Sequence, residues 1–124
     1  MTSNINQDLF KGMALTSQGR LSECLIRTNC VLTEWEFEDC TKNFNELVNI
    51  CIKLPRTNVV KQTNNYWHGV CRSLIFRFPD DLEILNLSKE GIIQVRSASR
   101  IGASDLGVNQ NRINTIKREL MKNS

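Results

Sequence analysis

The sequence is poor in the residues that build metal or catalytic centres. It has a single histidine, His68, and its five cysteines are widely spaced, with no Cys-x-x-Cys pair. Because zinc sites use four ligands that usually come in close pairs, we predict no metal and no other cofactor. The cysteines are odd in number, so we interpret them as reduced, buried thiols. No acid or nucleophile adjoins His68, and we therefore predict no catalytic residue and no enzymatic activity.

Long hydrophobic runs are also absent. No apolar stretch approaches the roughly 18 residues that a membrane span requires. The N-terminal MTSNINQDLF lacks the charged and apolar blocks of a signal peptide. A chain of 124 residues, of which 40% are hydrophobic, is long enough to fold as one domain. We therefore predict a soluble, cytoplasmic protein that has no contact with a membrane.

Positive charge is unevenly distributed along the chain. The formal net charge is +3, yet the segment 88–124 carries seven basic and three acidic residues. That segment therefore has a net charge of +4, whereas the first 87 residues have a net charge of −1. This asymmetry is typical of a protein whose one end approaches the phosphates of a nucleic acid.

Apolar residues spaced by three and four positions predict helices in the first half of the chain. We expect a short helix near 8–15 and another at 21–31. Thr33 and Glu36 form a capping-box pair, so a long core helix is expected to begin there and to end before Pro55.

The middle of the chain supports two interpretations. Helical spacing continues over about 58–73 and predicts a second long core helix. Alternation over about 74–88 then favours a small hairpin, although a continued helix also fits. The fold class is therefore mainly α, or α+β if the hairpin forms. We expect a helical core and dimerisation region at 1–87 and a DNA-binding region at 88–124.

The segment SRIGASDLGVNQNRINTIKREL has the spacing of a helix-turn-helix unit. Such a unit needs a small residue where its helices pack closest and a residue that tolerates positive φ in the turn. Ala103 and Gly107, four residues apart, meet these two demands. Apolar residues flank the turn or point back to the core. The motif-forming residues are then Ala103, Leu106, Gly107, Val108, Ile113 and Ile116.

Polar residues occupy the outward face of the expected second helix. Asn and Gln side chains can bond to adenine and Arg to guanine, while further basic residues neutralise phosphates. An ordinary helical hairpin is the alternative interpretation of this segment. The predicted DNA-binding residues are Arg96, Arg100, Asn109, Gln110, Asn111, Arg112, Asn114, Thr115, Lys117 and Arg118.

The stretch ASDLGVNQNRINTIK resembles the helix-turn-helix of phage Cro-type repressors and related small bacterial regulators. The family pattern of Ala, three residues, Gly-Val, four residues and Ile is met by Ala103, Gly107, Val108 and Ile113. The resemblance implies that Asn109, Gln110, Asn111 and Asn114 face the bases. It covers about 22 of the 124 residues. Gly102 departs from the pattern, because an apolar residue or threonine usually precedes the alanine.

A second stretch, SLIFRFPDDLEIL, is similar to part of the D subunit of the flagellar master regulator, a helical activator of similar size. The likeness rests on Phe76, Arg77, Phe78 and Asp80. It implies a subunit of a multi-subunit activator.

These patterns predict a sequence-specific transcriptional regulator, of phage or mobile-element type, whose helix-turn-helix enters the major groove. A homodimer would read two half-sites roughly 34 Å apart. The predicted partners are double-stranded DNA and a second copy or another regulatory subunit. The alternative function is a protein-binding adaptor, or an activator subunit, that contacts RNA polymerase or another regulator.

Overall fold

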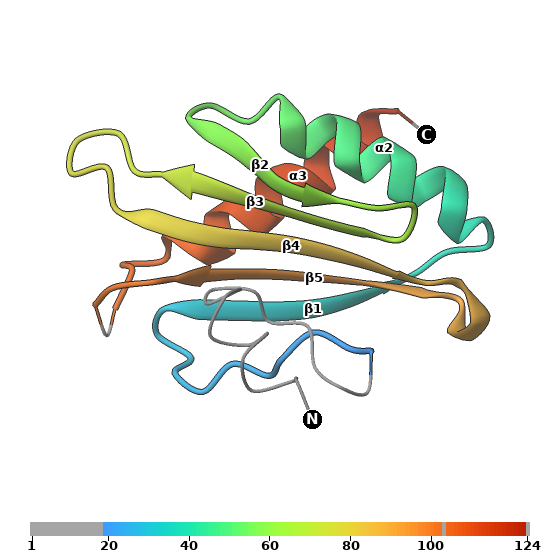
Figure 1. The fold of residues 1–124 in the computed structure, drawn as a ribbon, viewed down its shortest axis with the longest axis horizontal. Coiled ribbons are helices and arrows are strands. Elements are labelled where there is room, and N and C mark those ends of the chain that lie inside the picture. The colour runs from blue at the N-terminus through green and yellow to red at the C-terminus, as the bar shows by residue number, and fades with distance from the viewer. Residues whose placement is uncertain (1–18, 103, 124) are drawn as a thin grey trace.

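A computed structural model describes residues 19–102 and 104–123 of the chain. Its strands form one antiparallel sheet in the order β1-β5-β4-β3-β2, and both α-helices cover the same face (Figure 1). The strands are β1 (Cys30–Glu36), β2 (Thr57–Gln62), β3 (Tyr66–Arg72), β4 (Pro79–Leu87) and β5 (Ile92–Ser99). The helices are α2 (Cys40–Ile52), the short 3-10 helix η1 (Ser88–Glu90) and α3 (Val108–Lys122).

The expectation of a mainly α fold is wrong, because the sheet dominates. The segment 58–73 forms most of the β2–β3 hairpin rather than a helix. Six of the seven residues of β3 are buried, on both faces of the sheet. A strand buried on both faces shows no alternation of apolar and polar residues, so its spacing can mimic that of a helix.

The helix expected at 21–31 is absent, and the core helix expected from Thr33 ends before Pro55 as predicted but begins later. Thr33 and Glu36 lie in β1 and form no capping box. Helix α2 begins later, after Asp39, whose Oδ1 accepts a hydrogen bond of 3.1 Å from the backbone N–H of Lys42. Residues 22–29 form turns and irregular chain, and the helix expected near 8–15 lies outside the described residues.

The predicted hairpin over 74–88 is replaced by a loop and a central strand. Residues 73–78 connect β3 to β4, and β4 pairs with β3 on one side and β5 on the other. β5 in turn pairs with β1, so strands from before and after residue 87 share one sheet. The larger of the two hydrophobic clusters therefore draws residues from both sides of residue 87.

The helix-covered face of the sheet is apolar. Side chains of α2 and α3 pack there against buried residues of the three central strands, including Trp67, Leu82, Ile84, Ile93 and Val95. A Cβ added at Gly69 would overlap the indole ring of Trp67. Glycine at this position therefore allows the largest buried side chain to lie across its own strand.

The opposite face, which we call the polar face, buries ionisable groups. Tyr66 and His68 of β3 lie beside Asp81 and Glu83 of β4, and each is at most 3% exposed. Leu21 packs over this face against Tyr66, and its backbone N–H donates a hydrogen bond of 2.8 Å to Gln94 Oε1.

The interpretation of all cysteines as reduced thiols is wrong for one pair. Cys24 and Cys30 form a disulfide that closes a short loop before β1. Cys40, Cys51 and Cys71 are free and buried, as predicted for cysteines that act as small hydrophobic residues.

The helix-turn-helix is not present. One helix, α3, forms where the second helix was expected, but residues 100–107 that precede it include no helix among those described. Gly107 has the predicted positive φ, 84°, yet it serves as the N-cap of α3 rather than as a turn between two helices. Ile113 and Ile116 point into the core, whereas Leu106 is 92% exposed. Ala103 lies outside the described residues.

The described helices are also short. Within 19–102 and 104–123, none is long and apolar enough to cross a membrane.

Candidate anion-binding site

A small cavity lies between the first turns of α3, the connection from α2 to β2 and the end of β3. Its volume is about 210 Å³. We call it the arginine pocket, because three arginines line it and none of its lining residues is acidic. The lining residues are Leu54, Pro55, Arg56, Thr57, Cys71, Arg72, Val108, Asn111, Arg112 and Thr115.

Two of these arginines are held together by the chain itself. Arg56 has a left-handed backbone, with φ of 55°. Its Nε donates a hydrogen bond of 3.0 Å to the carbonyl of Arg72, and its own carbonyl accepts one of 3.0 Å from the Arg72 N–H. Neither guanidinium has a carboxylate within 4.0 Å among the ion pairs of the described residues. Neither charge is therefore neutralised by a described carboxylate, although Arg72 Nη1 donates a hydrogen bond of 3.4 Å to the carbonyl of Arg77 in the loop after β3.

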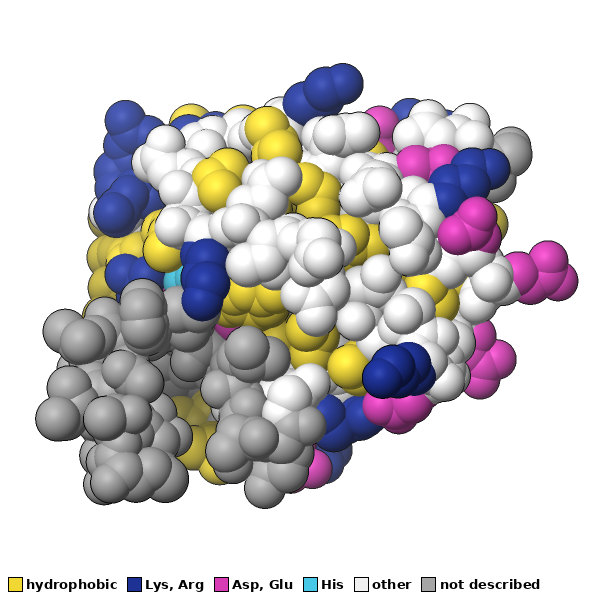
Figure 2. All heavy atoms as spheres, turned by 45° about the vertical axis from the view of Figure 1, so that its right-hand side comes forward, with side chains coloured by type: hydrophobic (Ala, Val, Ile, Leu, Met, Phe, Trp, Pro, Cys, Tyr) yellow, Lys and Arg dark blue, Asp and Glu magenta, His cyan; other side chains and the backbone are white. Residues whose placement is uncertain are grey.

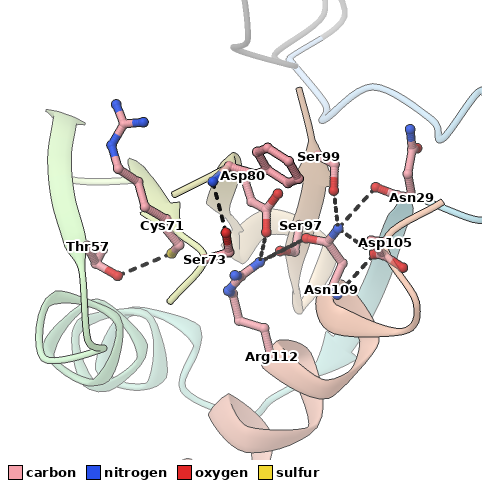
Figure 3. Close-up of polar contacts among 12 residues, drawn as sticks. Asn29, Thr57, Cys71, Ser73, Asp80, Ser97, Ser99, Asp105, Asn109 and Arg112 are labelled. Atoms are coloured by element: carbon pink, nitrogen blue, oxygen red, sulfur yellow. Dashed lines mark hydrogen bonds and ion pairs between the residues drawn. The ribbon is translucent and has the colours of Figure 1, made fainter. Parts of the chain in front are cut away.

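The third arginine, Arg112, is fixed from behind. Its Nη1 lies 2.9 Å from Asp80 Oδ2 and donates hydrogen bonds of 3.0 Å to Ser97 Oγ and 2.9 Å to Asn109 Oδ1 (Figure 3). The side chain is only 12% exposed. Since charge-assisted hydrogen bonds at this burial restrict the side chain to one geometry, Arg112 forms a rigid wall of the pocket.

Asn109 connects this wall to the neighbouring loops. Its Nδ2 lies within hydrogen-bond distance of the Asn29 carbonyl, Ser99 Oγ and Asp105 Oδ2, at 3.1, 3.0 and 2.6 Å (Figure 3). Asp105 also accepts hydrogen bonds from the N–H groups of Gly107 and Asn109. Burial tends to raise the pKa of Asp105, but these hydrogen bonds outweigh it and lower the pKa. Asp105 is therefore ionised, and it accepts hydrogen bonds from N–H groups at the start of α3.

The thiol in the pocket is not activated for chemistry. Burial raises the pKa of Cys71, and the nearby Arg112 only partly opposes this effect. Its Sγ lies 3.2 Å from Thr57 Oγ1. A nucleophilic cysteine needs a lowered pKa, so the pocket is suited to binding rather than to covalent catalysis.

The polar face offers a second group of ionisable side chains. Asp81 accepts two hydrogen bonds of 2.8 Å from Arg100, and its Oδ1 lies 2.7 Å from His68 Nε2. Tyr66 donates a hydrogen bond to Glu83. Burial tends to raise the pKa of Asp81, but the hydrogen bonds from Arg100 and His68 outweigh it and lower the pKa. Asp81 is therefore paired with His68 and Arg100, whereas His68 Nδ1 and Arg96 Nε are buried there without a hydrogen-bond partner among the described residues.

No three metal-binding side chains come together in the described part of the chain.

The residues predicted to read DNA do not share one surface. Asn109 is fully buried, and Arg112 is paired with Asp80. Arg100 pairs with Asp81 on the polar face, and Arg96 is 13% exposed there, 3.8 Å from Glu83. The residues that remain on the outer side of α3 are Gln110, Asn111, Asn114, Lys117 and Arg118, with Thr115 half-buried among them.

Sequence reasoning missed Arg56, Arg72 and Asp80 as members of a site. These residues lie on separate elements, and no local spacing relates Arg56 to Arg112. Of the residues that line the pocket, only Val108, Asn111, Arg112 and Thr115 were singled out, and for a different role. The FRFPDD stretch was noted, but nothing local indicates that Asp80 faces α3.

The comparison with known families assigns the chain. Residues 20–120 match the family described as "Protein of unknown function (DUF1499)". The chain belongs to this family. No curated protein matches it. The resemblances to Cro-type repressors and to the flagellar regulator subunit are overturned, because a five-stranded sheet with two α-helices has a different architecture.

Proposed function

We propose that this DUF1499 protein binds a small anionic ligand, bearing a phosphate or a carboxylate, in the arginine pocket. The observation that carries the proposal is a cavity of about 210 Å³ lined by Arg56, Arg72 and Arg112 and by no acidic residue. Guanidinium groups match the planar geometry of carboxylates and phosphates and bind them through paired N–H donors.

Size and polarity narrow the ligand class. The cavity is smaller than the 300 Å³ or more that is usual for drug-sized ligands. Asn111 and Thr115 from α3 and Thr57 from β2 add neutral donors and acceptors around the charges. The ligand is therefore a compact anion. The negative charge of Asp80 already offsets part of the positive charge of Arg112.

Calorimetric titration with inorganic phosphate and with succinate tests this function. We expect saturable binding by the wild type. Arg56→Gln and Arg72→Gln should each weaken binding about tenfold or more, because each removes a charge-assisted contact. Lys42→Gln, which removes one exposed positive charge from α2, is the matched control and should bind like the wild type.

Equal affinity of Arg56→Gln, Arg72→Gln and Lys42→Gln would reject the pocket as the binding site. Thermal unfolding provides a second readout, because a ligand that binds the folded state raises Tm with concentration.

DNA-binding regulation stays a prediction, and it no longer rests on a helix-turn-helix. The exposed face of α3 carries Gln110, Asn114, Lys117 and Arg118. If this face binds duplex DNA, Lys117→Ala should weaken binding to all sequences and reduce its salt dependence. The adaptor alternative also stays a prediction, and its protein partner would contact the same face of α3. Binding of duplex DNA that survives Arg56→Gln but not Lys117→Ala would favour the regulator over the anion-binding protein.

The cytoplasmic location also stays a prediction. The disulfide between Cys24 and Cys30 favours an oxidising compartment, since disulfides persist there and are rare in the reducing cytosol. The two locations can be distinguished by alkylating the free thiols of the isolated protein and measuring its mass, because cysteines in a disulfide are not alkylated.

A further inference from the structure

Three loops carry large apolar side chains exposed to solvent at one end of the molecule. They comprise residues 24–29 and 73–78 and the described residues 100–102 and 104–107, and we call this surface the loop end (Figure 1). Folded proteins rarely expose such side chains together unless the surface binds something. The most prominent are Leu25 (96% exposed), Leu74 (69%), Ile75 (78%), Phe76 (72%), Ile101 (51%) and Leu106 (92%).

Hydrogen bonds hold these loops beside one another. The backbone N–H of Arg100 donates to the Pro79 carbonyl at 3.1 Å, which joins the second and third loops. Asn29 Nδ2 donates to the Gly102 carbonyl at 2.7 Å, which joins the first and third. These hydrogen bonds therefore keep the three loops together at one end of the molecule.

The tips project rather than enclose a groove. The rings of Phe76 and Phe78 stack with centroids 5.4 Å apart, which gives the second loop a rigid apolar tip. The disulfide between Cys24 and Cys30 closes the first loop. Preorganised tips of this kind lose little conformational entropy on insertion into an apolar medium.

The charge of the loop end is positive. The described residues of the three loops carry Arg27, Arg77 and Arg100 against Asp105, a formal net charge of +2, although Arg100 is paired with Asp81. Glu23 adds one exposed negative charge next to the first loop. Figure 2 shows Lys and Arg side chains next to hydrophobic ones on the face that it presents. An anionic surface is therefore complementary to this end.

We propose that the loop end docks the protein onto a bilayer that contains anionic lipids. The apolar tips enter the boundary between headgroups and acyl chains, and Arg27 and Arg77 remain among the lipid phosphates. A protein partner would need a shaped recess for each separate tip, whereas a bilayer accepts them without one. This inference departs from the sequence prediction of no membrane contact, and it does not depend on the arginine pocket.

Sedimentation with vesicles tests the docking. We expect the wild type to bind vesicles of phosphatidylcholine mixed with phosphatidylglycerol. Combined Leu74→Ser and Phe76→Ser should weaken this binding about tenfold or more, because two apolar side chains no longer leave water. Val60→Ser, which alters a side chain 52% exposed in the edge strand β2, is the matched control and should bind like the wild type.

The charge contribution is tested separately. Combined Arg27→Gln and Arg77→Gln should weaken binding to the mixed vesicles about tenfold and leave any binding to phosphatidylcholine alone unchanged. Glutamine keeps the length of the side chain and removes its charge.

Three results would overturn the docking proposal. The first is that the wild type does not bind the mixed vesicles. The second is that the combined Leu74→Ser and Phe76→Ser variant binds them as well as the wild type does. The third is that light scattering shows self-association of the wild type, which this variant abolishes. The last would assign the loop end to a second copy of the chain. Arg56→Gln should retain vesicle binding, so failure of the arginine pocket and failure of the loop end are distinguishable.

Discussion

The two faces of the sheet are both buried, but by different chemistry. The helix-covered face is filled with apolar side chains such as Ile84 and Val95. The polar face instead buries Asp81 and His68 as a hydrogen-bonded pair, with Arg100 as a second partner of the aspartate. Apolar burial contributes stability directly, whereas a buried ion pair contributes little net but is costly to break. The faces should therefore respond differently to substitution.

The largest effect is expected on the helix-covered face. Ile84 is fully buried in the central strand β4. Ile84→Ala should lower the free energy of unfolding by about 3 to 4 kcal/mol, through lost transfer energy and the cavity left behind. Urea unfolding followed by circular dichroism measures this loss. Val59→Ala, at a position 46% exposed in β2, is the control and should change stability by less than about 1 kcal/mol.

The polar face is probed by removing one charge. Asp81→Asn keeps the shape of the side chain but leaves His68 and Arg100 without their anionic partner. We expect a loss of about 2 to 3 kcal/mol, below the value for a fully buried pair because the Arg100 side chain is 38% exposed. The same urea titration measures it. An unchanged unfolding midpoint would show that the polar face behaves as a solvated surface.

The disulfide tests how firmly the chain before β1 is tied over the polar face. Replacement of both Cys24 and Cys30 by serine should cost about 2 kcal/mol, the chain-entropy value for such a short loop. The wild type treated with reductant should lose a similar amount. If reductant has no effect on unfolding, the covering segment is held by contacts such as Leu21 on Tyr66 instead.

The smallest effect concerns pH. Because the pKa of Asp81 is lower in the folded state, its ionised form adds stability above the unfolded pKa of about 3.9. That contribution is lost as the pH falls through the folded value. Asp81→Asn should therefore flatten the dependence of stability on pH below about 4. Acid titrations of the two proteins that run parallel there would contradict the assignment.

Local sequence signals predicted some residues of the arginine pocket, but not that residues from separate elements meet there. Gly107 was expected to have positive φ and does, and the helix after it forms. Arg112 was singled out for its position on this helix, yet its partners Asp80 and Ser97 come from two different strands. Arg56 reaches the same pocket from the α2–β2 connection. Contacts between residues so far apart in the chain cannot be predicted from the spacing of residue types in the sequence.

The membrane prediction shows a similar limit. A search for a long apolar run tests for a spanning helix, which needs about 20 residues. Short loops such as 73–78 fall below that length, so this search cannot detect them whether they are buried or exposed. Their exposure and their proximity to 100–107 are visible only in the folded chain.

The sequence by itself determined the final helix, the conformation at Gly107 and the inward side of Ile113 and Ile116, since each depends on residues within a few positions. The tertiary structure alone decided that 57–62, 66–72, 79–87 and 92–99 form strands, that Cys24 pairs with Cys30 and that three arginines line one pocket. The physical reason is that a strand is stabilised by its neighbours on both edges and both faces, and those neighbours come from distant parts of the chain.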